Sequence, residues 1–269
     1  MINTASEEQR QHFEEQGYVV VRNAADPQQI QAAVAAVEDT IDRAEAGEFG
    51  DQFRWNDQEQ RVPAFVSDFF SAGKYYPAYG ELLDSVMLPF TESLLNKPVR
   101  CSWLLMLTAG GGYPYSVPLH RDNSELGGAN ENDMLEMHRM NLCYFQAPLL
   151  PDDRFLQVVP GSHLRHATEK EVTVARSNLA DIDVPGLTTI ELQPGDIVYR
   201  NTNLIHQGWN PEGVPRWTLV SGLWSADLPI QEIELQDFEL VSTPDFINGL
   251  PPHCQQAVKR YVQAYEQGR

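Results

Sequence analysis

Two histidines and one aspartate, His120, Asp122 and His206, have the residue types that hold a catalytic iron. Two imidazoles and one carboxylate occupy one face of a non-haem Fe(II) and leave its other positions open to further ligands and O2. Arg216 adds a guanidinium that can bind a carboxylate through two parallel hydrogen bonds, and Thr218 adds a hydroxyl two residues later. Together these residues predict an oxidative metal centre with a carboxylate-bearing co-substrate.

Extended segments are expected to position these side chains. An apolar run leads into His120 and Asp122, and side chains two apart on an extended segment point the same way, so the two can share one metal. A Pro-Gly-Asp turn at 194–196 starts a β-branched and aromatic strand that ends near His206. The strand that begins at Arg216 is expected to run back antiparallel beside the His206 strand.

Five motifs, in order along the chain, carry a resemblance to a known family. They are His120-x-Asp122, Val159-Pro160-Gly161-Ser162-His163, Leu192-x-Pro194-Gly195-Asp196, distal His206, and Arg216-x-Thr218. The chain resembles the phytanoyl-CoA hydroxylase (PhyH-like) family of Fe(II)- and 2-oxoglutarate-dependent dioxygenases. The resemblance spans roughly residues 10–225 and includes the Gly-Tyr-Val-Val-Val segment at 17–21.

The resemblance implies a role for each matching residue. It implies that His120, Asp122 and His206 bind Fe(II). Arg216 would bind the distal carboxylate of 2-oxoglutarate, with support from Thr218. The implied co-substrates are 2-oxoglutarate and O2, and the implied products are succinate, CO2 and an oxidised substrate. Halogenating relatives replace the carboxylate ligand by a small residue, so the presence of Asp122 favours hydroxylation or a related oxidation.

Two departures from the family pattern concern the co-substrate site. Many relatives carry an Asn-Gly pair before the Pro-Gly-Ser-His turn, whereas this chain reads Asp152-Asp153-Arg154. Many relatives also carry a polar or cationic residue on the strand before the His-x-Asp loop, and here Thr108 is the substitute. His138 is a further candidate for a position beside 2-oxoglutarate.

Other polar residues have more ordinary interpretations. His163 and His166 could bind a metal together, but a turn followed by a helical start is the better account of their spacing. Glu136 and His138 could replace the proposed ligand pair, yet no distal partner accompanies them. Arg121, between the two ligands, is expected to make a surface ion pair.

The pattern of turns and apolar segments predicts a mainly β protein with flanking helices and a double-stranded β-helix (jelly roll, cupin-like) core. Residues 1–269 are expected to form a single domain, with a C-terminal helix at about 251–267 and a core at about 99–225. The N-terminal helices, within about 6–97, are expected at 6–16, from 26 to about 46 and at 77–96. The expected strands lie at about 99–108, 138–147, 155–159, 188–192, 196–201 and 216–224. Segments 51–73 and 124–135 are candidate lids over the metal.

Charge and cysteine content narrow the function classes. Lys plus Arg total 19 and Asp plus Glu total 38, which gives a net charge of −19 and disfavours nucleic acid as a partner. The three cysteines are too few and too scattered for a disulfide framework, and no apolar run reaches membrane-spanning length. We expect a cytoplasmic monomer or homodimer that acts on a small molecule, with no membrane partner.

The favoured function is hydroxylation of a small polar or amphiphilic metabolite, with natural-product biosynthesis as a candidate setting. One alternative is a cupin-like metal enzyme that does not use 2-oxoglutarate, for which loss of Arg216 would leave activity nearly intact. Another is a non-catalytic 2-oxoglutarate or metal sensor, which would bind 2-oxoglutarate without producing succinate. Desaturation, epoxidation and ring formation would use the same residues as hydroxylation.

Overall fold

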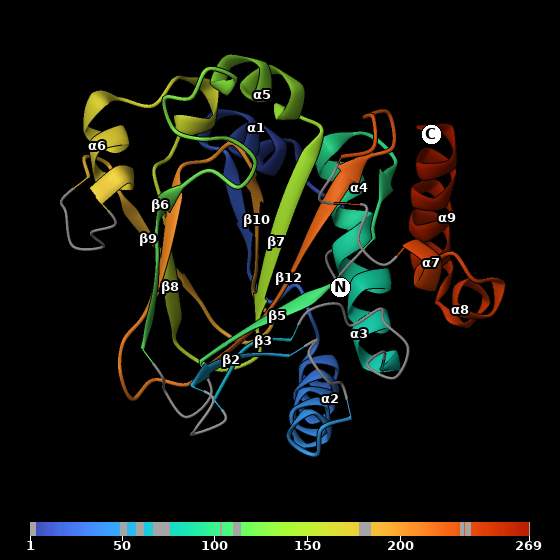
Figure 1. The fold of residues 1–269 in the computed structure, drawn as a ribbon. Helices are drawn as coiled ribbons and strands as arrows, with labels where there is room; N and C mark the ends of the chain where they lie inside the picture. Colours follow the sequence, from blue (N-terminus) through green and yellow to red (C-terminus); the bar gives the residue numbers. More distant parts are fainter. Residues whose placement is uncertain are drawn as a thin grey trace.

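Two antiparallel β-sheets face each other and form a jelly roll, with helices on the outer face of the larger sheet (Figure 1). This architecture confirms the double-stranded β-helix expected from the sequence. The computed structural model of the protein describes residues 4–48, 53–57, 62–66, 76–102, 104–109, 114–177, 184–231, 234 and 238–268.

The larger sheet has the strand order β1-β10-β7-β12-β5-β3-β2, and β4 pairs with β12. Its strands are β1 (Tyr18–Val21), β2 (Phe53–Asp57), β3 (Val62–Val66), β4 (Val99–Arg100), β5 (Leu105–Ala109), β7 (Leu142–Pro148), β10 (Ile197–Asn201) and β12 (Arg216–Ser225). The N-terminal strand β1 therefore lies at one edge of this sheet, beside β10.

The smaller sheet has the strand order β6-β11-β8-β9. Its strands are β6 (Tyr115–His120), β8 (Asp153–Val158), β9 (Thr188–Leu192) and β11 (His206–Asn210). The register pairs His206 directly with His120 on β6 and with Val158 on β8. Pairing of β6 with β11 therefore brings together two histidines that are far apart in sequence.

Along strand β7 of the larger sheet, successive side chains face in turn the flanking helices and the smaller sheet. Cys143, Phe145 and Ala147 belong to the core cluster that the flanking helices cover. Successive side chains of a strand point to opposite faces, so Tyr144 between them faces the smaller sheet. Arg200 is paired with Tyr144 in the register and shares its face. Near β9, the space between the sheets is filled by an apolar cluster made of Leu156, Val158, Ile190, Leu192, Val198 and Leu204.

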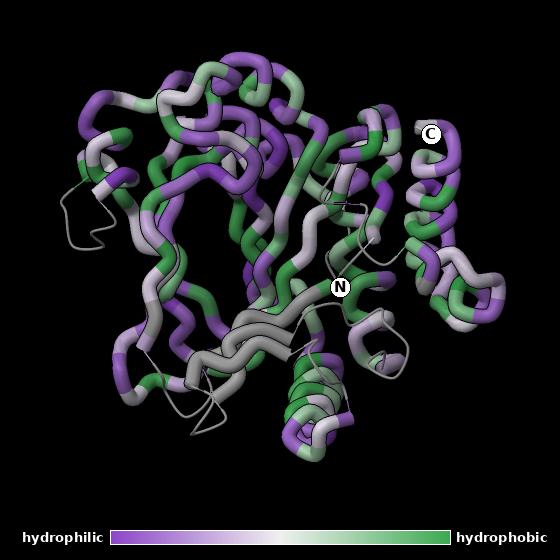
Figure 2. The backbone as a smooth tube through the Cα atoms, viewed as in Figure 1, coloured by the Kyte–Doolittle hydropathy of each residue, from purple (hydrophilic) through white to green (hydrophobic). Residues whose placement is uncertain are grey.

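The helices begin and end where their capping residues predict. Helix α1 (Glu7–Gln16) has a capping box at Ser6 and ends at Gly17, whose φ of 82° is left-handed. Helix α2 (Pro27–Glu45) begins at the capping residue Asp26 with proline in its first turn. Both agree with the helices expected at 6–16 and 26–46. Figure 2 shows hydrophobic and hydrophilic residues alternating along α2, as expected for a helix with one buried side.

The third expected helix, 77–96, is interrupted by a π-helical segment. It consists of α3 (Pro77–Leu82), the π-helical η2 (Leu83–Met87) and α4 (Leu88–Leu95). Pro89 lies in the first turn of α4, two residues after the end of η2, and lacks the N–H that an α-helix would donate to residue 85. The wider turn before Pro89 accommodates this lost bond and the bulk of its ring.

The remaining helices lie on the periphery. They are α5 (Glu131–His138), the short 3-10 turn η4 (Ser162–Leu164), α6 (Glu169–Ser177), α7 (Phe238–Val241), α8 (Pro244–Gly249) and α9 (Pro252–Gln267). Helix α9 corresponds to the expected C-terminal helix, and α5 lies across one end of the jelly roll near β6 (Figure 1). Among the described residues, no helix is long and apolar enough to cross a membrane.

Two expectations about strands are wrong. The strand expected at 138–147 begins only at Leu142, because His138 ends α5 and the residues after it form a turn. Arg216 does not lie beside the His206 strand, since β12 pairs with β7, β5 and β4 in the larger sheet while β11 lies in the smaller one. The Arg216 side chain instead spans the space between the sheets and contacts Asp153 on β8.

The two segments proposed as lids, 51–73 and 124–135, are described by the structure to different extents. Within 51–73, the structure describes only the backbone of β2 and β3, and the rest of that prediction lies outside the described residues. Segment 124–135 contains the start of α5, and its Glu131 is buried. Asn203 Nδ2 donates to the carbonyls of Met134 and Leu135, which ties this segment to the loop between β10 and β11.

Candidate metal centre

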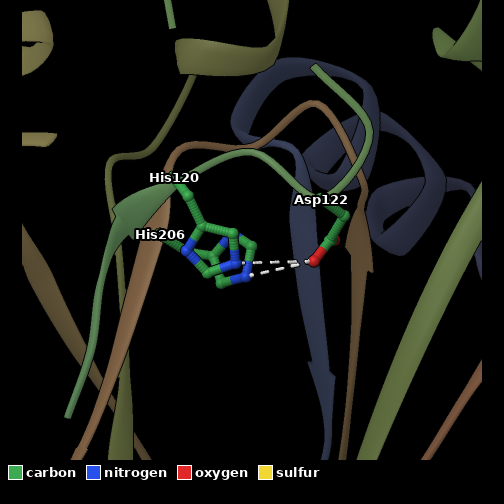
Figure 3. Close-up of side chains that lie close together, drawn as sticks. All are labelled: His120, Asp122 and His206. Atoms are coloured by element: carbon green, nitrogen blue, oxygen red, sulfur yellow. Dashed lines mark ion pairs between the residues drawn. The ribbon is translucent and has the colours of Figure 1, made fainter. Parts of the chain in front are cut away.

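His120, Asp122 and His206 converge at one end of the smaller sheet (Figure 3). The Oδ1 atom of Asp122 lies 3.7 Å from Nε2 of His120 and 3.6 Å from Nε2 of His206. The two imidazole rings have centroids 4.2 Å apart. One nitrogen from each histidine and one aspartate oxygen therefore face a common point. Among the described residues, no other group of three His, Cys, Asp or Glu side chains is arranged to hold a metal ion.

The protein fixes the tautomer of both histidines. Nδ1 of His120 lies 2.7 Å from the carbonyl oxygen of Pro118, and Nδ1 of His206 lies 2.9 Å from that of Leu204. A carbonyl oxygen can only accept, so each Nδ1 carries the proton and each Nε2 keeps its lone pair. This is the usual way in which a protein orients a neutral histidine ligand toward a metal.

Arg200 holds the carboxylate ligand from the opposite sheet. Its guanidinium donates to Oδ2 of Asp122 at 2.5 Å and lies over the ring of Tyr144, 5.1 Å from the ring centroid. Burial of Asp122 opposes its ionisation, but the positive charge and the hydrogen bond of Arg200 favour it, and the pKa of this carboxyl lies well below its usual range. Asp122 is therefore an anion that is ready to bind a cation.

The ligands differ in their access to solvent. The side chain of His120 is 34% exposed, that of Asp122 is 14% exposed and that of His206 is 5% exposed. Burial lowers the pKa of His206 well below its ordinary value, and the nearby Arg200 lowers it further. His206 is therefore neutral at physiological pH, as a metal ligand must be.

Arg216 and Thr218 meet a carboxylate between the two sheets. Nε of Arg216 donates to Oδ2 of Asp153 at 3.2 Å, and the Thr218 hydroxyl donates to the same oxygen at 2.7 Å. The Arg216 guanidinium also lies 5.1 Å from the centroid of the Phe155 ring. Asp153 and Phe155 belong to β8, so this contact crosses from the larger sheet to the smaller one.

The structure places the other two co-substrate candidates less directly. Thr108 lies on β5 and is paired with Trp217, the residue between Arg216 and Thr218. Its side chain lies outside the described part of the chain. His138 is buried at the end of α5, and its ring meets that of Trp224 edge to face at 6.0 Å, at the opposite end of β12 from Arg216. Both assignments remain predictions.

Arg121 does not make the expected surface ion pair, because its side chain is buried. It forms an ion pair with the buried Glu131, and it donates to the carbonyls of Asn203 at 2.6 Å, Ser162 at 2.9 Å and Arg165 at 2.8 Å. An arginine flanked by two ligands thus fastens the ligand loop to three other segments.

Among the described residues, His163 and His166 belong to no group of three side chains arranged to hold a metal ion. Nε2 of His163 lies 3.1 Å from the carbonyl oxygen of Glu14, and Nδ1 of His166 lies 3.1 Å from Oε2 of Glu131. The Pro-Gly-Ser-His turn therefore joins the smaller sheet to α1. This agrees with the turn interpretation of these two histidines.

Two residues of the site, Arg200 and Asp153, were not assigned a role from the sequence. Arg200 follows Tyr199 on a buried strand, and a charged residue on such a strand is itself a signal, because burial is costly unless the charge is paired. Asp153 lies in the stretch where the sequence departs from the family pattern. Neither signal identifies the partner, which lies on the other sheet.

Comparison with known protein families shows which family the chain belongs to. The family described as phytanoyl-CoA dioxygenase (PhyH) matches residues 13–210, which is more than half of the chain. The chain belongs to the PhyH family. No curated protein matches it.

Solved structures show the same fold at low sequence identity. EctD from S. alaskensis, with 2-oxoglutarate and 5-hydroxyectoine, has a TM-score of 0.65 and 16% identity over 86% of this chain and 80% of its own. HygX from Streptomyces hygroscopicus, with nickel and 2-oxoglutarate bound, has a TM-score of 0.63 and 18% identity over 84% and 89%. The carbocyclase SnoK from nogalamycin biosynthesis has a TM-score of 0.61 and 18% identity over 89% and 91%.

This PhyH protein is therefore an Fe(II)- and 2-oxoglutarate-dependent dioxygenase with the facial triad His120, Asp122 and His206. The donor set fits Fe(II), since two imidazole nitrogens and one carboxylate oxygen face one point. Iron bound there supplies the activation of O2 coupled to decarboxylation of 2-oxoglutarate. The chain itself supplies fixed ligand atoms and a buried environment on the His206 side.

Proposed function

We propose that this protein hydroxylates a small-molecule metabolite and releases succinate and CO2. The observation that carries the proposal is the triad, with each Nδ1 engaged by a carbonyl and an intact Asp122 in place of the small residue that halogenating relatives have. A triad of this kind leaves the rest of the metal's coordination positions open for 2-oxoglutarate and O2. Natural-product biosynthesis is the proposed setting, supported by the structural likeness to SnoK.

Arg216 and Thr218 are the proposed binding groups for the distal carboxylate of 2-oxoglutarate. Both face the space between the sheets, and both already donate to a carboxylate, that of Asp153. The donor set therefore fits a carboxylate, which a guanidinium and a hydroxyl can bind together. The family membership speaks against the alternative of a cupin-like enzyme that does not use 2-oxoglutarate.

The test begins with an anaerobic titration of the Fe(II)-loaded protein with 2-oxoglutarate. Chelation of iron by the 2-oxo acid is expected to produce a weak visible charge-transfer band, and Arg216→Gln is expected to require a higher 2-oxoglutarate concentration for the same band. Metabolites are then screened for substrate-stimulated succinate release, with His206→Ala as the inactive control. Binding of 2-oxoglutarate without succinate for every compound tested would favour the sensor alternative.

A further inference from the structure

The carboxylate of Asp153 is hydrogen-bonded to Arg216 and Thr218, the two residues that the proposed function assigns to 2-oxoglutarate binding. Its Oδ2 atom accepts from Nε of Arg216 at 3.2 Å and from the Thr218 hydroxyl at 2.7 Å. Nε of Arg216 also lies 3.1 Å from the Thr218 oxygen, so the three groups form a closed triangle. A carboxylate of the protein therefore makes contacts that the distal carboxylate of 2-oxoglutarate is proposed to make.

Burial makes this competition strong. Arg216 and Asp153 are each only 3% exposed, so water screens their interaction weakly. The single positive charge of Arg216 is already balanced by the single negative charge of Asp153. A second carboxylate placed on the same guanidinium would meet a like charge, and such a juxtaposition is unfavourable in a desolvated site.

The neighbouring Asp152 has a different environment. Asp152 is exposed, and its Oδ1 atom accepts from Nε2 of Gln193 at 2.9 Å on the surface. The two adjacent aspartates therefore carry the same charge, but only Asp153 contacts Arg216. This difference offers a matched control within the same turn of the chain.

We propose that Asp153 is a specificity-determining residue of the co-substrate site, which competes with dicarboxylates for Arg216 and Thr218. When 2-oxoglutarate binds, the carboxylate of Asp153 gives up contacts with these two donors. The concentration of 2-oxoglutarate needed to fill the site is therefore set by Asp153 as well as by Arg216. This inference rests on the proposed role of Arg216 and Thr218 as the anion site.

The experiment compares wild type, Asp153→Asn and Asp152→Asn. Asparagine keeps the shape of aspartate and removes the charge. Each Fe(II)-loaded protein is titrated anaerobically with 2-oxoglutarate, and the dissociation constant is taken from the charge-transfer band. We expect Asp153→Asn to bind 2-oxoglutarate about tenfold more tightly, or better, because one like charge has been removed. Asp152→Asn is expected to match wild type.

A second measurement avoids the metal. Glutarate has the distal carboxylate but no 2-oxo group, so its effect on the thermal unfolding of the metal-free protein reports on the anion site alone. We expect glutarate to raise the unfolding temperature more in Asp153→Asn and in Asp153→Ala than in wild type. A gain in affinity cannot come from a misfolded protein, so this outcome supports the inference whichever of the two variants is the more stable.

The outcomes separate the inference from the proposed function. Tight 2-oxoglutarate binding by wild type with equal or weaker binding by Asp153→Asn overturns the inference and leaves the proposed function standing. In that case Asp153 would merely support Arg216. Absence of the band in all three proteins, although Fe(II) binds, overturns the proposed function and the inference with it.

Discussion

The Arg200 guanidinium donates to the Oδ2 atom of Asp122 at 2.5 Å, while the Oδ1 atom of the same carboxylate faces the Nε2 atoms of both ligand histidines. One oxygen is thus held by the opposite sheet and the other is directed toward the metal position. A carboxylate held in this way offers a metal one oxygen. With Fe(II) bound, Arg200 would thus limit Asp122 to one ligand oxygen and leave other positions available to a 2-oxo acid.

Arg200→Gln is expected to loosen this control of Asp122. With Oδ2 released, the carboxylate can turn both oxygens toward the metal and take up a further position. We expect the variant to retain Fe(II) but to show a weaker 2-oxoglutarate charge-transfer band, with Arg200→Lys intermediate. The measurement pairs iron content with the amplitude of the band at saturating 2-oxoglutarate.

A surface pair supplies the control for Arg200. Arg22 forms an ion pair with Asp196 at 2.7 Å, but the Arg22 side chain is 55% exposed. Arg22→Gln is expected to leave both the iron content and the band unchanged. An undiminished band in Arg200→Gln at equal iron content would show that Arg200 does not control how Asp122 binds.

Arg121→Met is expected to destabilise the protein strongly. The substitution leaves Glu131 buried without its ion pair and removes the donor to three backbone carbonyls. Breaking one side of a buried pair costs about 3–5 kcal/mol in the free energy of unfolding. The measurement is denaturant unfolding of the metal-free protein.

Arg176→Met is the matched control for Arg121. Arg176 lies 3.7 Å from Glu125, and both side chains are largely exposed. Its loss is expected to change the free energy of unfolding by less than about 1 kcal/mol. A similar, small change for both variants would mean that the buried network around Arg121 does not stabilise the fold.

The stability of the metal-free protein is expected to fall below neutral pH because of His163. Burial lowers the pKa of His163 from 6.5 to about 4, although a hydrogen bond to the Glu14 carbonyl opposes this shift. The unfolded chain therefore takes up a proton on this residue at a higher pH than the folded chain does. The resulting contribution to stability is complete above pH 6.5 and is lost as the pH falls toward about 4.

His163→Gln is expected to make the stability less sensitive to pH. Across this window the variant should lose less stability than wild type, by up to about 3 kcal/mol, because no proton is taken up at this position on unfolding. The measurement is the free energy of unfolding in urea at several pH values. The exposed His12 provides the control, and His12→Gln should follow the wild-type profile. Parallel profiles for all three proteins would contradict the assignment.

Gly222 permits the Tyr144 ring to lie beneath Arg200. A Cβ atom on Gly222 would come within 2.4 Å of the Tyr144 ring, so Gly222→Ala must displace that ring. We expect a loss of about 1–3 kcal/mol in stability from overpacking. Gly249 has open space at the same position, and Gly249→Ala should cost little. Equal unfolding temperatures for the two variants would show that the Tyr144 ring can move without cost.

The ends of the first two helices were predicted well from the sequence, because the residues that cap a helix lie next to it in the chain. Ser6 and Asp26 cap helices at the predicted places, and Gly17 ends α1 in the left-handed conformation. The start of β7 was misplaced because the end of α5 depends on a distant loop. The Asn201 side chain donates to the carbonyls of His138 and Arg139 and so supports the helix end at that point. No pattern within residues 138–141 encodes that contact.

The sequence by itself determined the chemistry of the metal centre, because few residue types can hold Fe(II) and only His120, Asp122 and His206 occur with the motifs around them. Only the tertiary structure decided which charged side chains form ion pairs. Arg200 reaches Asp122 and Asp153 reaches Arg216 only because two sheets pack face to face, and each pair joins one sheet to the other. Such pairs depend on strand order and register, which are set by long-range packing and leave no spacing in the sequence.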